Sequence, residues 1–309
     1  DSGSWGTAEE IDFADAGDAY TGQVAVDPSG NAFAVWHESD GSITNVYANR
    51  YTSGAWQGAV EIDNADAGSA YHADVSVDSS GNAIAVWRES DGSHDNIYAN
   101  RYTGGAWQGA EDIDYGYTGG AFSPKIAVNS SGNAFAVWHE SDGGYKNVYA
   151  NRYTGGAWQG AEEIDYADAG DADYPQIAVD SSGNAFAVWA EKNGSYDNIY
   201  ANRYTGGAWQ GAEEIFHADG GNATSPRVAV DSSGNAFVVW YEYDGSRYDV
   251  YANRYTSGAW QGAEEIDYAD AGGAQSPEVA VDPSGNAFVI WYESDGSLYD
   301  IYVNRYTGG

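Results

Sequence analysis

Short apolar stretches recur along the chain, and the clearest of them runs from Ala32 to Trp36. Successive side chains of an extended strand point to opposite faces, so Ala32, Ala34 and Trp36 would share one face and Phe33 and Val35 the other. Both faces are apolar, which is typical of a strand packed between two neighbouring layers. The stretch therefore predicts a buried β-strand, preceded by a tight turn that contains Gly and Asn.

This stretch and its turn repeat with a fixed period. The turn glycine recurs every 51 residues, at Gly30, Gly81, Gly132, Gly183, Gly234 and Gly285. The strand tryptophan recurs in the same register, at Trp36, Trp87, Trp138, Trp189, Trp240 and Trp291. A fixed period of this size indicates a repeat architecture in which each unit buries its apolar faces against its neighbours.

Within one repeat the pattern predicts four strands, at residues 23–27, 32–38, 45–52 and 56–63, here called A to D. Six such units predict an all-β fold, a six-bladed β-propeller with four antiparallel strands per blade. We expect a single domain over residues 1–309, with blades at about 13–63, 64–114, 115–165, 166–216, 217–267, and 268–309 together with 1–12. A β-solenoid, the alternative, would need shorter repeats and capping ends.

The two ends of the sequence complement each other. Residues 5–12 match residues 56–63 and 107–114 at the same offset, whereas the last repeat stops at Gly309, where its own copy of this segment should begin. We therefore expect the N-terminal strand to complete the last blade and close the ring, which would leave no open sheet edge.

Positions that hardly vary among the six copies are candidates for the scaffold. Trp36 and Tyr47 recur in every repeat and are predicted to pair across the hairpin of strands B and C. Arg50 also recurs, and we expect it to bridge to Asp27 on the same face of the ring. Asn129 replaces that aspartate in the third repeat, where the bridge should be weaker.

The stretch from Val24 to Phe33, with its valine, aspartate, glycine and asparagine hairpin, resembles the bacterial propeller repeats of the NHL and SBBP type. It is more loosely similar to the Asp-box hairpin of sialidase-like propellers, although the serine-x-aspartate-x-glycine spacing is absent. The resemblance covers every repeat. It implies the fold and leaves the activity open, since such propellers include scaffolds, binding modules and enzymes.

The amino-acid composition disfavours several classes of binding partner. The formal charge of −35, from 47 acidic and 12 basic residues, disfavours nucleic acid and anionic membranes as partners. The chain contains no Cys, so disulfides and thiolate chemistry are excluded, and no stretch is apolar enough for membrane insertion. The acidic surface fits an extracellular or cell-surface location, and the chain could be a mature secreted protein.

The variable positions indicate a working face. In a four-stranded meander the D–A and B–C connections share one face of the ring, and the positions that vary most among the copies fall there. Loops on a rigid scaffold commonly carry recognition, although drift at exposed positions would also produce variation. The candidate ligand-binding residues on this face are Tyr20, His37, Tyr71, His72, Arg88, His139, Tyr145, Tyr174, Tyr196, Arg227, Tyr241, Arg247, Tyr248, Tyr292 and Tyr299.

The D–A connections are also rich in aspartate. Clustered carboxylates suit a hard cation such as Ca²⁺, although the spacing is not that of an EF-hand and solvated turn aspartates are the alternative. The candidate metal ligands are Asp15, Asp18, Asp66, Asp168, Asp171 and Asp270.

No nucleophile–base set or metal signature can be recognised among the histidines and acids. Near-identical repeats also disfavour a single asymmetric catalytic pocket. We therefore expect a non-catalytic, lectin-like binding or adhesion module that requires no cofactor, with Ca²⁺ possible, and that binds a glycan or another cell-surface ligand. The alternatives are a glycan-active enzyme related to sialidases or glycosidases, and a self-assembling structural subunit.

Overall fold

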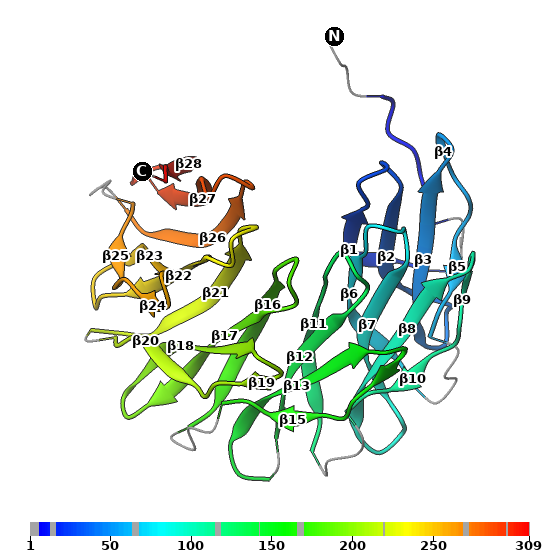
Figure 1. Cartoon of the computed structure of the whole chain (residues 1–309), viewed down its shortest axis with the longest axis horizontal. Helices are drawn as coiled ribbons and strands as arrows, with labels where there is room; N and C mark the ends of the chain where they lie inside the picture. Colours follow the sequence, from blue (N-terminus) through cyan, green and yellow to red (C-terminus); the bar gives the residue numbers. More distant parts are fainter. Residues whose placement is uncertain are drawn as a thin grey trace.

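The computed structural model describes residues 6–12, 17–63, 68–114, 119–141, 143–165, 170–218, 220–267, 272–294 and 296–308. In these residues every regular element is a β-strand, and the strands form six antiparallel sheets that follow one another along the chain. Figure 1 shows the sheets as blades arranged in an arc. The predicted all-β, six-bladed propeller is confirmed. None of the described segments is a helix that could cross a lipid bilayer.

In the first five blades three long strands precede two short ones. Blade 1 contains β1 (Ala19–Val26), β2 (Ala32–Ser39), β3 (Thr44–Thr52), β4 (Ala55–Trp56) and β5 (Val60–Glu61). Blade 2 contains β6 (Ala70–Val77), β7 (Ala83–Ser90), β8 (Asp95–Thr103), β9 (Ala106–Trp107) and β10 (Glu111–Asp112). Blade 3 contains β11 (Ala121–Val128), β12 (Ala134–Ser141), β13 (Lys146–Thr154), β14 (Ala157–Trp158) and β15 (Glu162–Glu163).

The remaining blades follow the same order. Blade 4 contains β16 (Ala172–Val179), β17 (Ala185–Asn193), β18 (Tyr196–Thr205), β19 (Ala208–Trp209) and β20 (Glu213–Phe216). Blade 5 contains β21 (Ala223–Val230), β22 (Ala236–Tyr243), β23 (Tyr248–Thr256), β24 (Ala259–Trp260) and β25 (Glu264–Glu265). Blade 6 contains β26 (Ala274–Val281), β27 (Ala287–Ser294) and β28 (Tyr299–Tyr306).

The fourth strand is interrupted, where the sequence predicted a continuous one. β4 and β5 both pair with β3, but between them the amide of Gly58 donates to the side-chain Oδ1 of Asn49 at 3.1 Å. Gly58 has a φ of 108°, in the left-handed region that favours glycine. A side chain of β3 therefore replaces part of the backbone ladder and bends the strand.

The predicted aromatic pair is confirmed. Trp36 and Tyr47 are cross-strand partners whose stacked rings have centroids 6.3 Å apart. The indole Nε1 of Trp36 donates to the buried Glu38 carboxylate at 2.9 Å, so the polar atom of the ring is satisfied inside the blade. The corresponding rings stack in all six blades.

The expected bridge between Arg50 and Asp27 does not form, since no ion pair joins them in the described structure. Both oxygens of Asp27 serve its own turn, accepting hydrogen bonds from the amides of Ser29 and Asn31 and from the side chain of Asn31. The guanidinium of Arg50 lies 5.2 Å from the ring centre of Tyr102 in the next blade and donates to its hydroxyl at 3.2 Å. Arg50 therefore joins blades through an aromatic ring.

A buried asparagine also ties each blade to the one before it. In blade 2, the side-chain Nδ2 of Asn100 donates to the backbone carbonyl of Ile62 in blade 1 at 2.8 Å. The same bond, always between residues 38 apart, is made by Asn49, Asn151, Asn202, Asn253 and Asn304. For Asn49 the acceptor is Ile11, so Ile11 takes on blade 1 the place that Ile62 takes on blade 2.

The arc is open between blades 6 and 1 (Figure 1). In the described residues β28 pairs only with β27, and residues 6–12 contain no strand, so the predicted closure is not shown and stays a prediction. Apolar side chains that other blades bury are consequently exposed on blade 6, as for Ile301 at 75%, and on blade 1, as for Val24 at 64%.

A cavity of about 160 Å³ between blades 5 and 6 is relevant to the closure; its lining includes Phe237, Val289 and Tyr306. At the interface of blades 4 and 5 the corresponding phenylalanine, Phe186, packs edge-on against Trp260. The sequence counterpart of Trp260 for blade 6 would be Trp5, which lies outside the described residues. The cavity is therefore where a closing N-terminal strand would place an indole ring.

A pair of engineered cysteines tests the closure. Ala48 and Val60 are cross-strand partners in blade 1, and their counterparts in a closed blade 6 are Val303 and Glu9. We expect Glu9→Cys combined with Val303→Cys to form an intramolecular disulfide on mild oxidation, because directly opposed strand residues lie within bridging distance. Mass spectrometry and non-reducing gels would detect it.

The chain has no cysteine of its own, so any disulfide that forms must involve the engineered residues. Ala48→Cys with Val60→Cys is the matched positive control. Efficient bridging of the control pair and none of the Glu9–Val303 pair would contradict the closure, and a disulfide-linked dimer would indicate pairing between two copies.

Candidate functional site

A cavity of about 730 Å³ opens between blades 4 and 5 on the face that carries the D–A and B–C connections. Blade 4 contributes the start of β16, the end of β17, the short loop that follows it and the start of β18. Blade 5 contributes the loop before β21, the end of β22 and the start of β23. Its described lining is Asp171, Asp173, Tyr174, Ala190, Lys192, Ser195, Tyr196, Asp197, Gly220, Gly221, Asn222, Thr224, Tyr241, Tyr243 and Tyr248.

A β-bulge at the start of β16 shapes one wall. The pairing of β16 with β17 shifts by one residue between Asp173 and Gln176, and Tyr174 adopts a φ of 58°, which is rare for a residue other than glycine. A bulge bends the strand and re-aims the side chains on either side of it. Asp173 and Tyr174, although adjacent in sequence, therefore both line the cavity.

Three carboxylates meet in this cavity. Asp173 accepts hydrogen bonds from Lys146 Nζ of blade 3 with both oxygens, at 2.9 and 3.0 Å. Asp171 accepts from the backbone amide of Lys146 at 3.0 Å. Burial raises the pKa of Asp197, the charges of Asp173 and Asp171 raise it further, and Lys192 opposes them. The site thus combines a carboxyl group whose pKa is raised with two further carboxylates close enough to influence it.

Tyrosine rings form the rest of the wall. The ring of Tyr248 packs against those of Tyr241 and Tyr243, with centroids 5.5 and 5.1 Å apart. Tyr174 and Tyr196 are exposed, at 53% and 37%. Aromatic faces beside carboxylates and an amide such as Asn222 are the surfaces that stack on and hydrogen-bond to a sugar ring.

The structure brings four predicted ligand-binding residues into this cavity, namely Tyr174, Tyr196, Tyr241 and Tyr248. Sequence reasoning missed Asp173, Lys192, Asp197 and Tyr243, which lie beside them. A signal for two of these was available. Asp173 and Asp197 occupy the columns of Tyr20 and Thr44, which vary from repeat to repeat. Asp173 is the only acid in its column, and Asp197 shares its acid with Asp95 alone.

Five other predicted residues contact one another in a row across blades 1 to 3. Tyr20 stacks on His37, which meets Tyr71 edge-on; Arg88 lies over Tyr71 and over Phe122, which stacks on His139. His37 and His139 are buried. His72 is the bulge residue of β6, with a φ of 57°. Their described contacts are those of scaffold packing between blades.

The remaining predicted residues lie away from the cavity. Arg227 pairs with Glu278 at 2.9 Å, and Arg247 pairs with Asp249 at 2.7 Å, so the arginines are bound to separate acids. Tyr292 packs edge-on against Tyr299, and Tyr145 is exposed at 51%. In the described structure these two arginines are not gathered into one cluster.

The predicted calcium ligands are only partly described. Asp18 accepts a hydrogen bond from the Tyr20 hydroxyl at 2.9 Å, and Asp171 lines the cavity. The other four predicted ligands, Asp15, Asp66, Asp168 and Asp270, lie outside the described residues.

No protein-family model matches the chain, and no curated protein matches it. Solved structures do resemble it. A protein of unknown function from Dyadobacter fermentans has a TM-score of 0.59 at 14% identity, with 96% of each chain covered. A leech intramolecular trans-sialidase has a TM-score of 0.58 at 9% identity, covering 99% of this chain and 70% of that one. The GH93 α-L-arabinofuranosidase of Fusarium graminearum has a TM-score of 0.53 at 12% identity, covering 92% of each.

At these identities the likeness shows the fold alone, a β-propeller, and the resemblance to NHL- and SBBP-type repeats is not confirmed. The comparison corrects the expectation of a non-catalytic binding or adhesion module. Structures named as glycan-active enzymes, among them the trans-sialidase, the arabinofuranosidase and an ulvan lyase, share this fold, so the alternative of a glycan-active enzyme replaces that expectation as a candidate.

His139, beside the cavity, predicts a pH dependence of stability. Burial lowers its pKa to about 4; Asp173, 3.6 Å away, and Asp171 oppose the shift, and Lys146 adds to it. The unfolded chain, with a His pKa of about 6.5, binds this proton more tightly, so this contribution to stability is present above pH ~6.5 and is lost as the pH falls toward 4. The loss is up to about 3 kcal/mol.

We expect His139→Gln to flatten the rise in the free energy of unfolding between pH 4 and 6.5, measured by urea denaturation. His94→Gln changes an exposed loop histidine and is the matched control. If both variants keep the wild-type slope, His139 does not stay neutral in the folded protein.

Proposed function

We propose that the protein is a glycan-active enzyme that cleaves a neutral saccharide in the cavity between blades 4 and 5. The observation that carries the proposal is Asp197, whose pKa is raised by burial and by the charges of two other carboxylates in a tyrosine-lined cavity. Pairs of carboxyl groups whose environments separate their pKa values are the acid and base of many hydrolytic sites.

In this proposal Asp197 is the general acid. Its proton passes to the glycosidic oxygen as the bond from that oxygen to the anomeric carbon breaks, and water then adds its hydroxyl group to the anomeric carbon. Both oxygens of Asp173 contact Lys146, whereas Asp171 uses only its Oδ1 for the Lys146 amide. We therefore assign Asp171 as the base that accepts the proton of water, and Asp173 as a positioning residue.

The charge of the cavity supports a neutral substrate. Among the described residues its lining has three aspartates, one lysine and no arginine, and the chain as a whole carries a charge of −35. A sialic or uronic acid would be repelled there, whereas a neutral sugar can stack on Tyr174, Tyr196 or Tyr248 at little electrostatic cost. The Fusarium structure holds arabinobiose, a neutral saccharide, on the same fold, which fits this choice.

An extracellular or cell-surface location accompanies this proposal, because polysaccharide substrates are met outside the cell and the acidic surface suits that setting.

The experiment is a screen of neutral polysaccharides and oligosaccharides for release of reducing ends, followed by kinetics of Asp197→Asn on any substrate found. We expect kcat to fall by about 10²–10⁴, the usual contribution of general acid catalysis, with loss of the high-pH limb of the pH profile. Asp95→Asn is the matched control, since Asp95 occupies the same position in blade 2. Its kcat should stay within about twofold of wild type, a change below 0.5 kcal/mol.

Equal rates for Asp197→Asn and Asp95→Asn would remove Asp197 from the mechanism. Absence of turnover across the neutral saccharides would overturn the proposal.

A further inference from the structure

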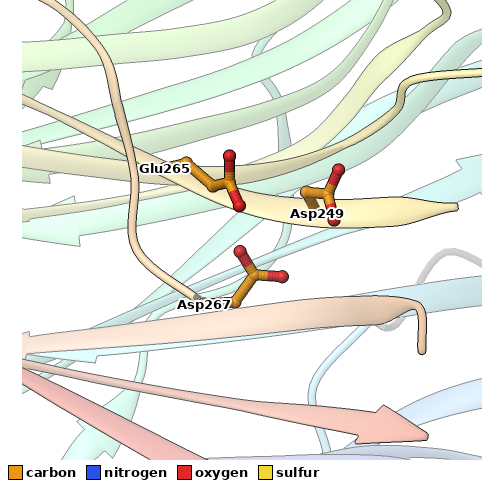
Figure 2. Close-up of side chains that lie close together, drawn as sticks. All are labelled: Asp249, Glu265 and Asp267. Atoms are coloured by element: carbon orange, nitrogen blue, oxygen red, sulfur yellow. The ribbon is translucent and has the colours of Figure 1, made fainter. Parts of the chain in front are cut away.

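A second group of carboxylates lies in blade 5, on the strands β23 and β25 and just beyond β25. Figure 2 shows the side chains of Asp249, Glu265 and Asp267 pointing toward one another. One carboxylate oxygen from each lies within 4.8 Å of the others. Asp249 and Asp267 are buried, with 4% and 6% of their surface exposed, and Glu265 is partly exposed.

This cluster is a departure from the first four repeats. The position of Asp249 is asparagine in the first four blades, at Asn45, Asn96, Asn147 and Asn198. Asp249 is the direct cross-strand partner of Glu242, so the change places two carboxylates opposite each other on neighbouring strands. Like charges directly opposite each other destabilise a sheet unless something compensates them.

The hydrogen bonding of blade 5 differs as well. In other blades the buried indole Nε1 donates to the following glutamate, as Trp189 does to Glu191 at 2.8 Å. Trp240, the counterpart in blade 5, is fully buried and its Nε1 has no hydrogen-bond partner. The carboxylate of Glu242 therefore does not satisfy it as its counterparts do. The burial of Tyr251 and the charges of Glu242, Glu265, Asp249 and Asp267 together raise the pKa of Tyr251 to about 12, which brings these four acids into one neighbourhood.

One buried oxygen in the cluster is also unsatisfied. Oδ1 of Asp267 is shielded from solvent and has no hydrogen-bond partner, while the carboxyl group accepts a bond from the amide of Val250. Buried carboxylate oxygens are normally hydrogen-bonded or bound to a metal ion. Arg247 also pairs with Asp249, at 2.7 Å.

We propose that Asp249, Glu265 and Asp267 form a Ca²⁺-binding site. Ca²⁺ binds oxygen ligands at about 2.3–2.6 Å, so two ligands on opposite sides of the ion are about 4.6–5.2 Å apart. The oxygens of the cluster all lie within 4.8 Å of one another, a spacing that suits ligands of one shared ion. The partly exposed Glu265 leaves a side through which water can complete the coordination.

The three carboxylates do not line the cavity between blades 4 and 5, but Asp249 lies on β23, the strand that also carries the cavity residue Tyr248. Tyr248 lines the cavity and Asp249 follows it at the start of β23. An ion bound by Asp249 would fix this end of the strand. The proposal itself is independent of any activity on glycans, and its test contains no saccharide.

Calorimetric titration of the chelator-treated full chain with Ca²⁺ at 0.15 M NaCl tests the site, the salt screening diffuse binding to the acidic surface. We expect one saturable site with a Kd in the range of about 10⁻⁵–10⁻³ M. Asp249→Asn should weaken it at least tenfold. This variant should fold, because it restores the asparagine that four other blades carry at the position.

Glu264→Gln is the matched control, since it removes one charge from the exposed neighbour of Glu265 on the same strand, β25. Its Kd should stay within twofold of wild type. Equal titrations of Asp249→Asn and Glu264→Gln would overturn the proposal, because any binding would then lie elsewhere, for instance at the D–A loops. A wild-type chain without a saturable site would overturn it as well.

Discussion

The structure depends on one buried side chain per blade, the asparagine that donates to the backbone of the preceding blade. Asn100, 1% exposed, donates from its Nδ2 to the carbonyl of Ile62 and accepts with its Oδ1 from the amides of Gln108 and Gly109. A single residue thus fixes the bend in its own fourth strand and the register between two blades. Without it, buried backbone groups on both sides of the interface would lose their partners, at about 1–3 kcal/mol each.

Much of this architecture could be predicted from the sequence because repetition exposes it. The fixed period and the apolar faces of residues 32–36 predict strands packed between blades, and the register places Trp36 beside Tyr47. The interrupted fourth strand could not be predicted in this way. It results from a side chain of one strand bonding to the backbone of another, and residues 56–63 carry no sign of that partner.

Charge pairing was the weakest part of the prediction. Arg50 and Asp27 recur together, but each has a better partner nearby, an aromatic ring in the next blade and the amides of its own turn. The candidate site shows a related limit. Its tyrosines were visible in the variable columns, whereas the roles of Asp173 and Asp197 depend on burial and on Lys146 from another blade. Burial and the contact with Lys146 depend on residues that are distant in sequence and close in space, so the sequence pattern does not reveal them.

The bulge in the first strand of each blade has a wider consequence. A residue other than glycine holds the left-handed conformation there in every repeat, namely Thr21, His72, Ser123, Tyr174, Ser225 and Ser276. Such a conformation costs on the order of 1 kcal/mol at each position, and the surrounding sheet maintains it whatever the side chain is. The backbone conformation at these six positions is therefore independent of the side chain, so substitutions there can change binding specificity without changing the fold. The six bulge positions are therefore structurally equivalent, and the one at Tyr174 faces the cavity.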